Sequence, residues 1–128
     1  MTDSLARMSA FSNPSDLAPI KIWDGVVARA VAGAEATFAL IELEPNTHVP
    51  EHHHVNEQTG ILLRGSMSFT IGDETKQLQP GEMWVIPADV PHSVISGPEG
   101  VTLAELFAPP RADWAGLERL PATPVTLR

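Results

Sequence analysis

Three consecutive histidines occupy positions 52–54, in the stretch EHHHVNEQ. Imidazole nitrogen is a good ligand for zinc and for other first-row transition metals, so this stretch is a candidate metal site. The chain contains no cysteine, which excludes thiolate ligands and disulfides. Any metal must therefore be held by imidazole, carboxylate or amide groups.

The spacing of these residues decides which side chains can converge on one ion. Successive side chains of an extended strand point to opposite faces, so His52 and His54 point one way and His53 points the other. The same parity places Gln58 with the pair and Glu57 with His53. A turn just before Glu57 would reset this phase and put Glu57 in the place of Gln58.

Two further histidines lie outside the cluster. His92 follows a turn bracketed by prolines in PGEMWVIPADVPHSV, and this turn would deliver a ligand from a distant part of the chain. His48 shares the parity of His52, but Pro50 intervenes. We therefore assign His48 to the surface or to the surroundings of the site.

Short apolar runs separated by turn residues must position these ligands. The runs span residues 26–31, 38–43, 60–63, 66–71, 83–86, 93–95 and 101–107. Turn chemistry lies between them, including RG, GDE, QPGE and GPEG, and Gly72-Asp73 is expected to close a hairpin. Seven short strands at this spacing predict an all-β sandwich or barrel.

The ends of the chain read differently from its middle. We expect residues 1–20 to form an N-terminal arm, and residues 21–128 to form one barrel domain with a C-terminal extension from about 110. The stretch RADWAGLERL predicts a short C-terminal helix. Met67 and Met83 are assigned to the core, and the three tryptophans, Trp23, Trp84 and Trp114, to the core or its caps.

Composition excludes several classes of function. The net charge is −8 over 128 residues, and such an acidic chain repels nucleic acid. No run approaches the roughly 18 apolar residues of a membrane span. The N-terminus lacks the apolar segment of a secretory signal, so the expected location is the cytoplasm.

The joint spacing of these residues resembles the two motifs of the cupin superfamily. The first motif matches Asn46, His52, His54, Gln58 and Gly65, and the second matches Gly81, Pro87, Asp89, His92 and Ser96. Four positions depart from the family pattern, with Asn46 and Asp89 replacing glycines, Gln58 replacing glutamate and Ser96 replacing asparagine. The resemblance covers roughly residues 22–110.

This resemblance implies a double-stranded β-helix, or jelly-roll barrel, with a divalent metal held inside it by His52, His54, Gln58 and His92. Three neutral imidazoles and a neutral amide leave the charge of the ion uncompensated, which favours anionic substrates. Zinc, nickel, iron, manganese and copper all suit such a site. The alternative is a set of hydrogen-bonded histidines without metal, as in cupins that lost the site.

The run 101–107 carries a carboxylate on its more apolar row. Val101, Leu103, Glu105 and Phe107 share one face, and burial of that face would place Glu105 inside the barrel, as an acid or base. The alternative is that the opposite row, which begins at Thr102, faces inward.

The stretch FAPPRADW extends the resemblance to the pectin-degradation cupins, which open the ring of 4,5-unsaturated uronates. Their Asp-x-Phe-x-x-x-Arg pattern corresponds here to Glu105, Phe107 and Arg111, which the resemblance implies as catalytic residues. A rigidly held Arg111 would suit bidentate recognition of a carboxylate. The alternative is a surface arginine near Asp113 or Glu118.

These observations favour an enzyme, namely a metal-dependent isomerase or lyase that acts on a small anionic, enolisable substrate such as an unsaturated uronate. A metal-dependent dioxygenase and a non-enzymatic, metabolite-binding cupin are the alternatives. Cupins of this size pair through sheet edges, so we also expect a homodimer, with the N-terminal arm lying across the partner barrel.

Overall fold

The computed structural model describes residues 9–125, and this part of the chain is all-β. Eight strands follow one another in the order β1 (Ile20–Trp23), β2 (Val26–Ala32), β3 (Thr37–Leu43), β4 (His48–His52), β5 (Glu57–Ile71), β6 (Glu74–Leu78), β7 (Met83–Ile86) and β8 (His92–Ala108). The helical elements of the described part are two short 3-10 helices, η1 (Pro14–Asp16) and η2 (Ala112–Gly116). Among residues 9–125, no helix is long and apolar enough to cross a membrane.

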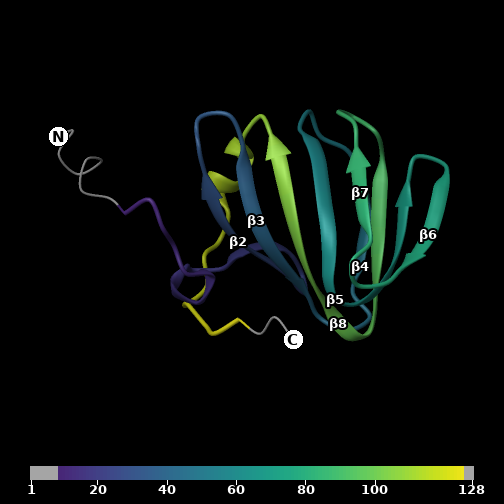
Figure 1. Cartoon of the computed structure of the whole chain (residues 1–128), viewed down its shortest axis with the longest axis horizontal. Coiled ribbons are helices and arrows are strands. Elements are labelled where there is room, and N and C mark those ends of the chain that lie inside the picture. Colours follow the sequence, from purple (N-terminus) through teal and green to yellow (C-terminus); the bar gives the residue numbers. More distant parts are fainter. Residues whose placement is uncertain (1–8, 126–128) are drawn as a thin grey trace.

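The strands form two layers that share the long strands β5 and β8 (Figure 1). The C-terminal half of β8 pairs with β3 and with the first half of β5, and this layer continues to β2 and β1 on one side and to β7 on the other. The N-terminal half of β8 pairs with β4 and with the second half of β5, which pairs with β6. This antiparallel arrangement is the predicted jelly roll.

Two pairs of predicted strands are in fact continuous. The runs 60–63 and 66–71 join in β5, and the runs 93–95 and 101–107 join in β8. The RG and GPEG segments, which were expected to be turns, bend these strands without ending them. At the bend the pairing of β5 with β8 continues, with a register shift on each side of Gly65. Gly65 has a φ of 88°, and a Cβ there would lie 1.9 Å from the carbonyl oxygen of Gly100, so only glycine fits this crossing.

The hairpin prediction is confirmed, since Ile71 pairs with Glu74 around Gly72-Asp73. The predicted runs do not include β1 and β4. β1 has only four residues, too few for a clear pattern, and β4 contains Pro50 and three polar residues among its five, so it lacks the apolar alternation of a strand.

The predicted C-terminal helix is wrong beyond its first turn. Only Ala112–Gly116 is helical, as a 3-10 turn. The residues that follow lie beside β1, where the amide of Lys21 donates to the carbonyl of Glu118 and the amide of Leu120 donates to the carbonyl of Pro19. Backbone bonds to β1 therefore replace those that would have continued the helix.

The core lies between the two layers and is formed by inward residues of all eight strands together with Trp114. Met67 is fully buried as predicted, whereas Met83 is 73% exposed, because Trp84 and Ile86 form the inward row of β7. The layered core leaves one cavity next to the histidines, which is described below.

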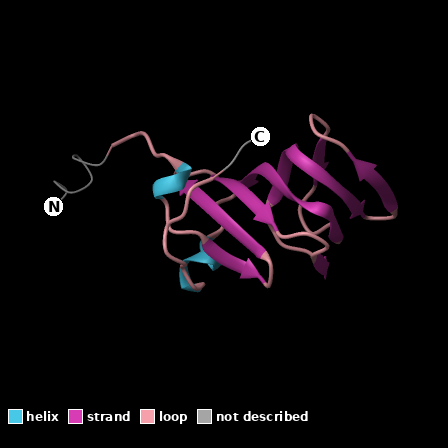
Figure 2. Cartoon of the chain, turned by 90° about the horizontal axis from the view of Figure 1, so that it is seen from below, coloured by secondary structure: helices cyan, strands magenta, loops and turns pink. Residues whose placement is uncertain are grey.

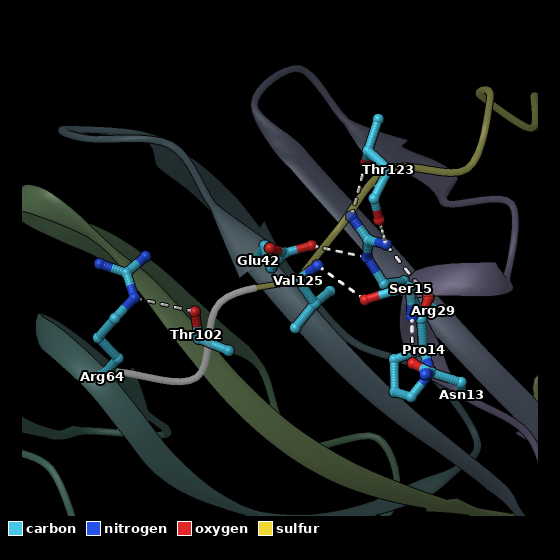
Figure 3. A network of polar contacts seen from close by, with 9 residues as sticks. All are labelled: Asn13, Pro14, Ser15, Arg29, Glu42, Arg64, Thr102, Thr123 and Val125. Carbon is cyan, nitrogen blue, oxygen red and sulfur yellow. Dashed lines mark hydrogen bonds and ion pairs between the residues drawn. The ribbon is translucent and has the colours of Figure 1, made fainter.

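Arg29 on β2 fastens both terminal segments to the outer face of the sheet (Figure 3). Its side chain is 3% exposed and donates to Glu42 on β3, to the carbonyl of Pro14, and to the carbonyl and hydroxyl of Thr123. Figure 2 shows both 3-10 helices at the end of the molecule where the terminal segments lie. The predicted arm is thus anchored to the barrel at Pro14, while its residues 1–8 lie outside the described part of the chain.

Replacing Arg29 with methionine is expected to lower the free energy of unfolding by about 3 kcal/mol, because Glu42 and the terminal carbonyls lose a buried charged partner. Urea unfolding followed by circular dichroism measures the loss. Arg64→Met is the matched control, since Arg64 makes two bonds of 3.2 Å to neutral acceptors, one of them at the surface. An equal loss in both variants would contradict the fastening role of Arg29.

Candidate metal centre

Three histidines from two strands and a loop converge inside the barrel. His52 ends β4, His54 lies in the loop between β4 and β5, and His92 begins β8 opposite His52. One ring nitrogen from each lies within 4.8 Å of the other two. An ion held at about 2.1 Å by each nitrogen needs separations of roughly 3 to 4 Å, so binding would draw the rings slightly together.

Backbone carbonyls fix the orientation of all three rings. The Nδ1 atoms of His52, His54 and His92 lie 2.8 Å from the carbonyl oxygen of Pro50, 3.0 Å from that of Asn56 and 2.9 Å from that of Val90. A carbonyl only accepts, so each Nδ1 carries the proton and each Nε2 presents a lone pair. Such outer bonds hold imidazole ligands in the tautomer that binds metal.

The electrostatics of the cluster favour the neutral form of each ring. Burial is the main cause of a lowered pKa at His52 and His54, and it lowers the pKa of His92 to about 4. The Nε2 atom of His92 is buried and has no hydrogen-bond partner among the described residues. A buried lone pair without a donor is the arrangement that a metal ion would satisfy.

The side-chain amide of Gln58 faces the ring nitrogens of the histidine cluster. Its nitrogen donates to the carboxylate of Glu105, so its oxygen is the atom that lies 2.9 Å from Nε2 of His54. With the proton of His54 on Nδ1, this contact brings two lone pairs together, and a cation between them would relieve the repulsion. The donor set of three Nε2 atoms and one amide oxygen therefore fits a divalent ion.

The other candidates from this part of the sequence face outward. The side chain of His53 is 64% exposed and lies 3.8 Å from Asp89. His48 and Glu57 are also exposed, and neither belongs to the cluster. The turn before Glu57 exists, but it does not exchange the faces of Glu57 and Gln58.

Glu105 lies in the inward row of β8 and is 5% exposed, so the alternative with Thr102 facing the cavity is wrong. One of its oxygens accepts both the amide of Gln58 and the indole N–H of Trp84, the latter at 2.9 Å. Burial raises the pKa of this carboxyl to about 7, and the two donors oppose that rise. The carboxylate thus lies directly behind the amide of Gln58, and it reaches the histidines through that amide.

Gly60 makes room for the contact between Trp84 and Glu105. Gly60 lies on β5, between β7 and β8, and it pairs with Trp84 on β7 and with Glu105 on β8. A Cβ at Gly60 would lie 2.5 Å from the Trp84 ring and 2.8 Å from Cγ of Glu105. The missing side chain therefore lets the indole cross β5 to reach the carboxylate.

Gly60→Ala is expected to push the indole away from Glu105 and to destabilise the fold by about 2 kcal/mol, the usual cost of overpacking. Tryptophan fluorescence and urea unfolding measure the two effects. Gly116→Ala is the control, since a Cβ there meets nothing within 4 Å. Unchanged fluorescence and stability in Gly60→Ala would contradict this role of Gly60.

Arg111 borders the same cavity from the turn after β8. Its guanidinium lies 4.9 Å from the ring centre of Phe107 and 4.7 Å from that of Trp114. Its Nε and Nη2 atoms donate to the carboxylate of Asp113 at 3.0 and 2.9 Å. Asp113 was one of the two partners that the sequence offered as an alternative for this arginine. No acceptor within residues 9–125 bonds the remaining nitrogen, Nη1, which is therefore available to a ligand.

Asn56 links the Arg111 turn to the histidines. Its side chain is buried and donates to the carbonyls of Pro109 and Pro110, while its own carbonyl accepts from His54. The amide of Arg111 donates to the hydroxyl of Thr37 at 3.0 Å. The position of Arg111 is therefore tied to both β3 and the loop that carries His54.

A cavity of about 100 Å³ connects these groups. Its imidazole, amide and charged lining consists of His52, Gln58, His92, Glu105 and Arg111, and the indole N–H of Trp114 lies in the same lining, buried without a hydrogen-bond partner among residues 9–125. Phe107 forms part of the apolar wall, at a ring-centre distance of 6.0 Å from His54. All the predicted catalytic residues and three of the four predicted ligands thus meet around one space, and His54 closes the cluster beside it.

Three departures from the cupin motifs keep the backbone that the motifs require. Asn46 and Asp89, which replace glycines, have φ values of 56° and 63°. Asparagine and aspartate tolerate this left-handed conformation better than other non-glycine residues. Ser96 is buried and uses its hydroxyl to join Thr47 to Glu44, so it anchors the loop before β4.

Sequence reasoning missed the supporting roles of Trp84 and Asn56. The alternation of β7 indicates that Trp84 faces inward, but its contact with Glu105 depends on the register of β7 and β8 across β5. Asn56 shares the parity of His54 and Gln58, and that was the available signal.

Comparisons with known proteins agree with this geometry. Residues 39–104 match the family model described as the cupin domain. The chain is 32% identical over 72 residues to the H2HPP isomerase of Bacillus subtilis, and 31% identical over 65 residues to the pectin degradation protein KdgF of Dickeya dadantii. These matches cover 55% and 51% of the chain, but only 30% and 59% of the two relatives.

Among solved structures, KdgF from a Halomonas species superimposes with a TM-score of 0.75 at 18% identity, over 83% of this chain and 98% of its own length. At that identity the likeness establishes the fold, which is the antiparallel jelly roll described above. The matched family model covers both histidine motifs and half of the sequence. The chain belongs to the cupin family.

Proposed function

We propose that the protein is a metal-dependent isomerase or lyase for a small anionic, enolisable substrate, with His52, His54, Gln58 and His92 as its metal ligands. The observation that carries this proposal is that the histidine cluster, a buried carboxylate and a guanidinium border one cavity. These are the groups needed to polarise a carbonyl, to move a proton and to hold a carboxylate.

A divalent ion bound by these ligands would supply Lewis-acid polarisation of the substrate oxygens. The four ligands are neutral, since Nδ1 keeps the proton of each histidine and Gln58 is an amide. The nearest carboxylate, Glu105, lies behind Gln58. A cage without its own negative charge attracts anionic substrates.

Glu105 is the proton carrier in this proposal. Its carboxylate takes a proton from the carbon next to the substrate carbonyl, the electron pair moves to the carbonyl oxygen, and the proton returns at the same or a neighbouring position. Trp84 and Gln58 both donate to one oxygen of this carboxylate and hold it in place. Arg111 binds the substrate carboxylate through Nη1, and Phe107 packs against the substrate.

The relatives support a reaction of this class. One is named an isomerase and another a pectin degradation protein, and each aligns with this chain over part of its length. An unsaturated uronate and a 2-oxo acid both belong to the proposed class, because each is a carboxylate with an enolisable carbonyl or its masked form.

The test uses protein purified without nickel affinity, characterised by elemental analysis and then loaded with each of the five candidate metals. We expect metal-dependent exchange of carbon-bound protons of a 2-oxo acid in D₂O, or ring opening of an unsaturated uronate, without oxygen consumption. Turnover that consumes oxygen would establish a dioxygenase instead. Ligand binding without turnover with every metal would establish a metabolite-binding cupin.

A further inference from the structure

We propose that the natural substrate has a compact apolar side chain, as a 2-oxo acid with a branched aliphatic chain does, and is not a polyhydroxylated sugar acid. This inference rests on the proposed function, because it specifies the substrate of the same site. It depends on what lines the cavity away from the histidines.

The cavity wall away from the polar groups is apolar, and it combines the rings of Trp23, Phe69 and Trp114 with a set of aliphatic side chains. Six buried aliphatic side chains from both layers contribute to it, namely Val26, Ile41, Leu43, Val49, Val94 and Leu103. Ligand surface that contacts these side chains leaves water for an apolar environment. Each buried methylene group of a ligand strengthens binding there by roughly fourfold.

Most polar groups of the cavity are already committed, and the indole N–H of Trp114 is the buried donor of the lining that has no partner among residues 9–125. His52 and His92 direct Nε2 into the cluster, and both ends of the Gln58 amide are bonded. Glu105 and Arg111 have roles in proton transfer and carboxylate binding under the proposed function. Within residues 9–125, the lining includes no serine, threonine, asparagine or lysine.

A sugar acid would therefore bring several hydroxyls, of which the indole N–H of Trp114 can serve one, while the others find no partner in the lining. Each hydroxyl that loses water without gaining a bond weakens binding by roughly tenfold. The cavity has a volume of about 100 Å³. That space suits a short branched chain, with the 2-oxo acid group held between the metal ligands and Arg111.

The experiment compares two ligands that differ in one group. In 4-hydroxy-2-oxopentanoate, a hydroxyl replaces one methyl of 4-methyl-2-oxopentanoate. Calorimetry with the zinc-loaded full chain is expected to show at least ~10-fold tighter binding of the methyl compound. Equal or tighter binding of the hydroxylated compound, or of an unsaturated uronate, would overturn the inference.

Substitutions in the wall locate the origin of the preference. Val94→Thr introduces a hydroxyl of nearly the same shape at the cavity wall, and it is expected to reduce the preference to less than ~3-fold. Val49→Thr, on the neighbouring strand, serves the same purpose if Val94→Thr does not fold. Ile95→Thr is the control, because Ile95 is the adjacent outward residue and is 50% exposed. An unchanged preference in both wall variants would overturn the assignment to this wall.

A second measurement separates this inference from the proposed function. Proton exchange at C3 of each compound is followed by NMR in D₂O with the same zinc-loaded protein. Tight binding of the methyl compound without exchange in any metal form supports the inference and rejects the proposed function. Exchange of both compounds with equal affinity supports the proposed function and rejects the inference.

Discussion

Replacing His92 with alanine is expected to weaken zinc binding by more than ~100-fold. Outer groups that only orient a ligand contribute about 10- to 100-fold to metal affinity, so the loss of a direct ligand costs more. His92 also supplies the one nitrogen of the cluster that is buried without a partner. Calorimetric titration of the metal-free protein with zinc, together with elemental analysis of the purified protein, measures the loss.

His53→Ala is the matched control within the same run of histidines. Its ring faces solvent, so zinc binding should be unchanged. His92→Gln tests whether loss of binding in the alanine variant reflects a collapsed site, because glutamine fills most of the space. Retained affinity in both His92 variants, or lost affinity in His53→Ala, would contradict the assignment of ligands.

Strand alternation predicted the composition of the cluster although His54 does not lie in a strand. Residues 53–56 form a loop, and its geometry is set by tertiary bonds, including the amide of Asp89 to the carbonyl of His54 at 2.8 Å. An even number of loop residues separates β4 from β5, so the alternation of inward and outward residues continues across it. The alternation argument therefore identified the right residues. The position of His54, however, depends on tertiary bonds of the loop as well as on strand geometry.

The inward row of β8 was equally predictable, because three of its four members are apolar and one layer of a sandwich buries one face. The two hydrogen-bond donors to Glu105, Gln58 and Trp84, could not be predicted in the same way. Trp84 reaches it across Gly60 and Gln58 reaches it along β5, and both contacts depend on the registers of three strands. Register between strands distant in sequence is decided by packing of the whole barrel, which no local pattern records.

The continuous strands β5 and β8 were missed because glycine was read as a strand end. At a corner of the barrel a strand must bend and approach its neighbour closely, and glycine serves that purpose as well as it serves a turn. A sequence pattern cannot separate these two uses. The missing C-terminal helix has a similar cause, since its backbone bonds are made with β1.

Replacing Glu105 with glutamine is expected to reduce turnover by at least ~10³-fold while zinc remains bound. General acid–base catalysis by a positioned side chain contributes about 10²- to 10⁴-fold, and an amide cannot carry the proton. Metal binding should persist, because a single oxygen of Glu105 accepts both Gln58 and Trp84, and the amide oxygen of glutamine can take its place. Proton exchange of 4-methyl-2-oxopentanoate and zinc titration measure the two properties on the same sample.

Glu57→Gln separates this effect from a general change in charge, because Glu57 is the exposed carboxylate next to Gln58 on the opposite face. It should retain full turnover. Glu105 is the only carboxylate among the residues that line the cavity, within the described residues 9–125, so no neighbouring acid can replace it. Normal turnover in Glu105→Gln would show that the proton moves through water or through the substrate itself, and Glu105 would then serve only to orient Gln58 and Trp84.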